Sequence, residues 1–275
     1  MTTVKTATRV ALVRAEWTKL TSTPFLALTA ALAVGLSLLV TALLGAAMGS
    51  REAYCAVNEC VQGTLRPHET VVTAGVLGDG MPGAGLSVLM LLGAMSLLVE
   101  HRTRTLSTSF MVVPRRERVV LTKAAVVSVV AFVLGLATMV LSGLAFNNLG
   151  GLAASHIDPL SGELWGIYLR TALVLGVAAV FGLAVAALTW SMVVTVATVL
   201  LWPLFMELLI PAALPQLGAE LAALMPFANA RHFVGMQDGL DFPWGPLGSG
   251  VYFLVVVLVL FAAGTVVTAR RAAAR

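Results

Sequence analysis

Residues 124–146 read AAVVSVVAFVLGLATMVLSGLAF, an apolar run that contains no charged side chain. An α-helix needs about 20 predominantly apolar residues to cross the hydrocarbon core of a bilayer. This run therefore predicts a membrane-spanning helix. The number of similar runs in the rest of the chain then decides the fold class.

Five more stretches meet the same criterion, so the chain is predicted to be an all-α, polytopic membrane protein. The six predicted spans are residues 25–48, 81–99, 124–146, 167–189, 192–210 and 251–268. The fourth and fifth are almost continuous, but about 40 apolar residues is twice a membrane thickness, so we predict a tight hairpin between them. The composition agrees, because 59% of residues are hydrophobic and 11% are charged, against about 25% charged residues in soluble domains. Residues 1–275 are read as one transmembrane domain.

The basic residues predict the orientation of these spans. Under the six-span prediction, 13 of the 17 lysine and arginine residues lie on one side, in segments 1–24 and 100–123 and in the C-terminal tail. Lysine and arginine are enriched in cytoplasmic segments. We therefore expect both termini in the cytoplasm. The net charge of +4 follows from this topology, so we expect no nucleic-acid partner.

Segment 1–24 is predicted to form an amphipathic helix at the membrane–water interface. Four apolar residues share one helical face, namely Val10, Val13, Trp17 and Leu20. The charged side chains of Glu16 and Lys19 fall largely off that face. A basic helix with one tryptophan suits the interface. The helix is either an anchor only or an element that also touches a cytoplasmic partner.

Two of the segments on the opposite side have informative sequences. Residues 211–250 are apolar but broken by proline and glycine, which predicts short re-entrant helices that do not cross the membrane. The first outward loop, residues 49–80, holds Cys55 and Cys60. A local disulfide is favoured over two free thiols because the outside is oxidising. Metal binding is not expected, since no histidine lies close to either cysteine.

The cytoplasmic loop 100–123 contains a short apolar helical face with Leu106 and Phe110, ended by Pro114. Such a face needs a surface to pack against, either the lipid or a cleft in a cytoplasmic protein. The alternative is a solvated basic loop, which the topology alone would require.

In its order of residues this loop resembles the corresponding loop of ABC-2-type exporter permeases. The residues that carry the resemblance are Glu100, Arg102, Thr105, Leu106, Pro114, Arg115 and Lys123. The chain departs from the family at Arg104, where a glycine is common. Residues 16–20 are similar to the start of actinobacterial members, and residues 224–230 to the family segment before the last span. The resemblance covers the whole chain in layout.

The resemblance implies the permease subunit of an exporter in a bacterial cell membrane. Residues 100–123 would hold a coupling helix in a groove of a separate ATP-binding subunit, and a second permease copy or paralogue would complete the pathway. The cargo would be amphipathic or hydrophobic, such as a drug, an antibiotic or a lipid. None of the three lysines follows a glycine, so this chain has no phosphate-binding loop. We expect it to be no enzyme and to bind no cofactor, with ATP and magnesium on the partner.

Glu207 is the acidic residue that lies well within a predicted span. Ionisable residues inside membranes are often functional, so a proton-coupled role is one interpretation. The other is an interfacial carboxylate before Pro211, paired with Arg170 or Arg231. The rival function is an ion-coupled secondary transporter, which would show inverted repeats and ionisable residues at the midplane. No clear repeat is present.

Overall fold

The structure is a computed structural model that describes residues 2–22, 24–57, 76–77, 83–103, 116–149, 158–213, 217–236 and 240–273. Every element in these ranges is a helix, which confirms the predicted all-α fold class. In chain order they are α1 (Thr2–Thr21), α2 (Pro24–Val57), α4 (Ala84–Arg102), α6 (Arg116–Leu149), α7 (Gly162–Thr189), α8 (Met192–Leu201), η2 (Trp202–Met206), α9 (Glu207–Ala213), α10 (Gly218–Ala223), α11 (Pro226–Val234) and α12 (Pro246–Ala273).

Five of these helices, α2, α4, α6, α7 and α12, are long and apolar enough to cross a membrane. They correspond to the first, second, third, fourth and sixth predicted spans. Much of their outer surface is apolar, for example Leu43 at 63% exposed and Leu247 at 73% exposed. Soluble monomers rarely expose large apolar patches. The arrangement is that expected of a polytopic membrane protein.

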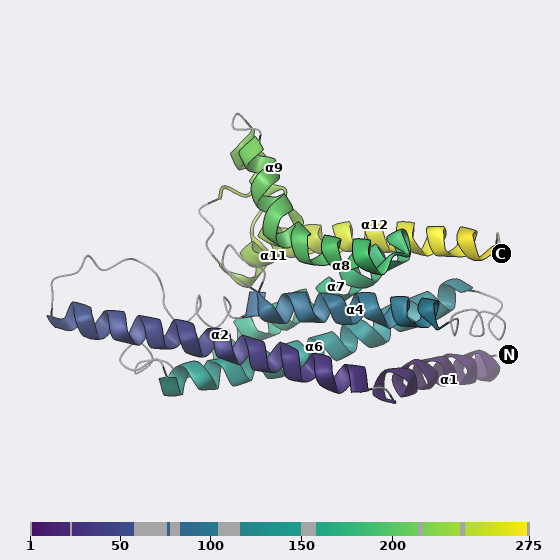
Figure 1. Ribbon diagram of the computed structural model, residues 1–275, viewed down its shortest axis with the longest axis horizontal. Helices are drawn as coiled ribbons and strands as arrows, with labels where there is room; N and C mark the ends of the chain where they lie inside the picture. Colours follow the sequence, from purple (N-terminus) through teal and green to yellow (C-terminus); the bar gives the residue numbers. More distant parts are fainter. Residues whose placement is uncertain are drawn as a thin grey trace.

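The predicted fifth span, residues 192–210, is not one continuous α-helix. The ten-residue α8 is followed by a π-helical turn, η2, and then by α9. The physical reason is Pro203, which has no backbone N–H to donate to the preceding turn. Figure 1 shows α8 running along the bundle and α9 turning steeply away from it. A sixth uninterrupted span is therefore not confirmed.

Several helices extend beyond the predicted spans. Helix α2 continues to Val57, so Cys55 lies in a helix and not in a loop as predicted. Helix α6 begins at Arg116, which makes the end of segment 100–123 helical. The side chain of Cys55, the whole of Cys60 and residues 104–115 lie outside the described residues. The disulfide therefore stays a prediction. So does the coupling helix with Thr105, Leu106, Phe110, Pro114 and Arg115.

Helix α7 forms the centre of the bundle and packs against α4, α6 and α12. Glycines let α4 and α7 approach until their backbones touch. A Cβ atom on Gly93 would lie 1.8 Å from the carbonyl oxygen of Ala179, and one on Gly182 would lie 2.0 Å from that of Met90. Small residues commonly permit such close packing between membrane helices.

The two chain ends lie at the same end of the bundle (Figure 1). The short helices α10 and α11 lie within the segment 211–250 for which helical pieces were predicted. In Figure 1 α11 lies near the start of α12, at the opposite end from the termini. The basic side chains at this end include one on α1, one in the last turn of α4, one in the first turns of α6 and one in the last turn of α12. They are Lys19, Arg102, Lys123 and Arg271. We call this the basic end.

Candidate functional site

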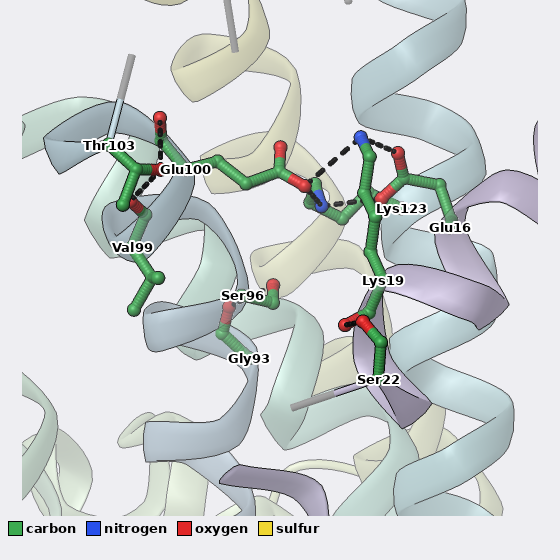
Figure 2. Close-up of polar contacts among 9 residues, drawn as sticks. All are labelled: Glu16, Lys19, Ser22, Gly93, Ser96, Val99, Glu100, Thr103 and Lys123. Carbon is green, nitrogen blue, oxygen red and sulfur yellow. Dashed lines mark hydrogen bonds and ion pairs between the residues drawn. The ribbon is translucent and has the colours of Figure 1, made fainter. Parts of the chain in front are cut away.

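An ion cluster at the basic end joins α1, α4 and α6. Its four members are Glu16 and Lys19 on α1, Glu100 on α4 and Lys123 on α6. The Nζ atom of Lys123 lies 2.5 Å from Oε2 of Glu16 and 2.9 Å from Oε1 of Glu100. The Nζ atom of Lys19 lies 2.7 Å from Oε1 of Glu16 and 3.2 Å from Oε1 of Glu100. Figure 2 shows the four side chains converging from three helices.

Three members of the cluster are buried. Lys123 is 3% exposed, Glu16 is 4% exposed and Glu100 is 8% exposed. A buried charge is costly unless it is paired and hydrogen-bonded. Two carboxylates and two ammonium groups balance each other here, so the cluster as a whole is neutral. Its geometry satisfies the condition under which charged groups remain stable inside a fold.

The cluster ties together the two ends of the undescribed segment 104–115. Glu100 lies in the last turn of α4, which ends at Arg102, and Lys123 lies two turns into α6. Both side chains therefore sit where the chain leaves and re-enters the bundle. The ion pair between Glu100 and Lys123 links the end of α4 to the start of α6. The ion pair between Glu16 and Lys123 links α1 to the same place.

The structure corrects part of the predicted amphipathic face of α1. Val13 and Trp17 are exposed, as expected for a face that meets lipid, but Leu20 is buried and faces the bundle. Glu16 was predicted to lie off the packed face and is instead buried. Its burial is compensated by its contacts with the ammonium groups of Lys123 and Lys19.

The surroundings shift the pKa values of the two α1 residues in opposite directions. Burial raises the pKa of Glu16, but attraction and hydrogen bonds from Lys123 and Lys19 outweigh it, so the pKa lies below its ordinary value of 4.5. Burial likewise lowers the pKa of Lys19, but the hydrogen bonds and attraction of Glu16 and Glu100 outweigh it and hold that pKa above 10.5. Both groups therefore favour their charged forms in the folded protein.

A second group of side chains at the basic end surrounds Trp190, in the turn between α7 and α8. Trp190 has a φ of 55°, the left-handed conformation that lets the chain reverse in a two-residue turn. The His101 ring packs against it in a T-shaped arrangement with centroids 4.4 Å apart, and the Arg271 guanidinium carbon lies 5.8 Å from its ring centre. The predicted hairpin between the fourth and fifth spans is present, but sequence reasoning gave this tryptophan no role.

At the opposite end, Glu207 caps a helix. Its carboxylate accepts hydrogen bonds from the backbone N–H groups of Phe227, at 2.6 Å, and Ala228, at 3.0 Å. These groups belong to the first turn of α11, which starts with Pro226 and has no cap from its own side chains. A carboxylate at a helix N-terminus is stabilising. Asn229 strengthens the same corner by accepting a hydrogen bond from Trp244 Nε1 at 2.8 Å.

The predicted site residues thus fall into separate places. Glu16, Lys19, Glu100 and Lys123 form the ion cluster, whereas Trp17 points outward and Arg102 is exposed. The cluster can hold three helices in one arrangement and can carry a displacement of one to the others. Its carboxylates and ammonium groups are paired with one another, so none of them is available as a nucleophile. Comparisons with models of protein families, with curated proteins and with solved structures find no match to this chain.

Proposed function

We propose that the chain is the transmembrane permease subunit of an ATP-driven exporter of the ABC-2 type, located in a bacterial cell membrane with both termini in the cytoplasm. A separate ATP-binding subunit would bind the segment around residues 104–115. A second permease copy or a paralogue would complete the pathway. The cargo would be amphipathic or hydrophobic.

The observation that carries this proposal is the buried ion cluster. A force applied by an ATPase to segment 104–115 enters the bundle through α4 and α6, the two helices that the segment connects. Glu100 and Lys123 make these two helices move together, and Glu16 adds α1 to the moving unit. Charge pairs that are buried and satisfied act as rigid links, because breaking one leaves an uncompensated charge.

The path of the chain also supports six passages. Both termini lie at one end of the bundle (Figure 1), as expected for an even number of passages. Five long helices would supply five of them, and α8 with η2 and α9 returns the chain from the end of α7 toward the opposite end. In this proposal the bent segment formed by α8, η2 and α9 is the fifth passage in chain order, and α12 is the sixth.

Glu207 gives little support to the rival ion-coupled transporter. Its carboxylate is engaged with two backbone N–H groups at the start of α11. A proton-carrying residue has to exchange partners, and here exchange would uncap a helix. We therefore assign Glu207 a structural role in the proposed permease.

The proposal is tested by co-expressing the full chain with ATP-binding proteins encoded near its gene and purifying through a tag on the chain. We expect one of them to co-purify, and Leu106→Asp to abolish co-purification while leaving the chain folded. Arg118→Gln is the matched control, because Arg118 is exposed on α6 at the same end. Failure of every such ATPase to associate would refute the proposal. Transport in vesicles that needs an ion gradient and no ATP would support the secondary transporter instead.

A further inference from the structure

An open groove of about 620 Å³ lies at the basic end, on the side of α4 that faces away from the ion cluster. Small-molecule sites commonly measure about 300–1,000 Å³. Its lining comes from two places, the last two turns of α4 and the turn that connects α7 to α8. The groove is therefore large enough to hold part of an amphiphile.

The lining changes from apolar to basic along α4. Met95, Val99 and Arg102 follow one another at i, i+4 and i+7, which puts them on one helical face. Met192 extends the apolar wall from the start of α8, and both Val99 and Met192 are about half exposed, at 47% and 45%. The groove thus has an apolar wall that leads up to an exposed guanidinium group.

The charge around the mouth is positive. Arg102 lines it, and Arg271 lies beside the lining residue Trp190, with 5.8 Å between the guanidinium carbon and the ring centre. The acidic residue nearest in sequence, Glu100, is held in the ion cluster by Lys123 and Lys19. Its side chain leaves α4 about 160° around the helix from Arg102, at roughly 100° per residue. A ligand that fits this distribution carries an anionic head and an apolar tail.

We propose that this groove binds an anionic phospholipid, with the head group at Arg102 and the acyl chains along Met95, Val99 and Met192. Arginine is well suited to a phosphate group, because its planar donors can bind two oxygens at once. Trp190 also lines the groove, and tryptophan is enriched at membrane interfaces. The inference deepens the proposed function by naming anionic lipid-like molecules as the cargo class, and that cargo role rests on the proposed exporter.

The binding test uses the purified full chain in a neutral detergent, without ATP or a partner. Phosphatidylglycerol with brominated acyl chains is titrated, and the quenching attributable to Trp190 is taken as the difference from Trp190→Phe. Arg102→Gln should weaken binding about tenfold, since one hydrogen bond to a charged group contributes at least that factor. Arg118→Gln, which removes the same charge at the same end outside the groove, should change the Kd less than about twofold.

A second pair of variants tests the apolar wall. Val99→Trp fills the groove and should lower the affinity, whereas Val129→Trp places the same bulk on an exposed position of α6 and should not. Brominated phosphatidylcholine should bind the wild type more weakly than phosphatidylglycerol, and glycerol phosphate without acyl chains should not compete.

Equal effects of Arg102→Gln and Arg118→Gln would overturn the inference, since binding would then reflect general attraction to a basic surface. Equal affinity for phosphatidylcholine, or competition by free glycerol phosphate, would overturn it as well. The binding assay needs no ATPase. Selective lipid binding without any associating ATPase would therefore refute the exporter proposal and leave the lipid site intact. An ATPase that associates, together with no selective lipid binding, would refute the lipid site and leave the exporter proposal intact.

Discussion

The ion cluster predicts a strong energetic coupling between two residues that lie 107 positions apart in the chain. Lys123→Met keeps the length of the side chain and removes its charge. The loss leaves Glu16 and Glu100 to share Lys19, which is itself 37% exposed in its side chain. Removing one partner of a buried pair costs about 3–5 kcal/mol. We expect that loss in the free energy of unfolding.

Glu16→Gln should cost a similar amount, because it leaves the buried ammonium of Lys123 with one carboxylate at 2.9 Å. The double variant Glu16→Gln with Lys123→Met should cost about 2 kcal/mol less than the sum of the two single variants, since contacting groups in one network are not additive. The fourth corner of the cycle is the wild type.

The assay is equilibrium unfolding in mixed micelles, in which circular dichroism follows the helix content as the denaturing detergent is raised. Arg118→Gln is the control and should change the free energy of unfolding by no more than about 0.5 kcal/mol, as exposed substitutions usually do. Strict additivity in the cycle would show that the 2.5 Å contact does not hold α1 to α6. A Lys123→Met variant as stable as the control would also refute the argument.

The remaining predictions concern the cap, the close helix contact and acid. Glu207→Gln should destabilise α11 by about 2 kcal/mol, because a neutral amide replaces the carboxylate that accepts two short hydrogen bonds. Protease cleavage near α11 should therefore increase. It should not increase in the exposed control Glu220→Gln. Gly93→Ala should cost about 3 kcal/mol or more in unfolding, since its Cβ would meet a backbone oxygen at 1.8 Å. Gly166→Ala, with open space around it in α7, should instead stabilise the protein by up to about 1 kcal/mol. The stabilising contribution of Glu16 should be fully present above its ordinary pKa of 4.5 and lost as the pH falls through its lowered pKa in the fold. A spin-label distance from α1 to α6, followed on acidification, checks this, and an unchanged acid transition in Glu16→Gln would contradict it.

Five helices could be predicted from the sequence because long apolar runs have few stable alternatives to a membrane helix. Their ends could not, since helices continue into polar sequence wherever a partner is available. Helix α6 illustrates this, because it starts at Arg116, in charged sequence before the apolar run. The break in the predicted fifth span has a local cause in the sequence, Pro203. The length of the apolar run does not reveal it.

The site was less predictable than the fold. Glu100 and Lys123 were singled out through the family resemblance, but nothing nearby in the sequence pairs them with Glu16. Helical periodicity places a glutamate on the solvated face unless a distant cation is known to face it. One usable signal was present: the opposite charges of Glu100 and Lys123 flank the same predicted membrane boundary, which favours a contact. The role of Glu207 depends on a helix that begins 19 residues later, and no local pattern indicates that.

The short α8 has a consequence for the surrounding bilayer. Ten residues at about 1.5 Å each make a straight apolar helix of about 15 Å, against a hydrocarbon thickness of about 30 Å. The rest of this passage therefore falls to η2 and α9, which continue directly from α8 and turn away from the bundle (Figure 1). We expect the bilayer to be perturbed beside the bend between α8 and α9, because the apolar surface of the protein changes direction there.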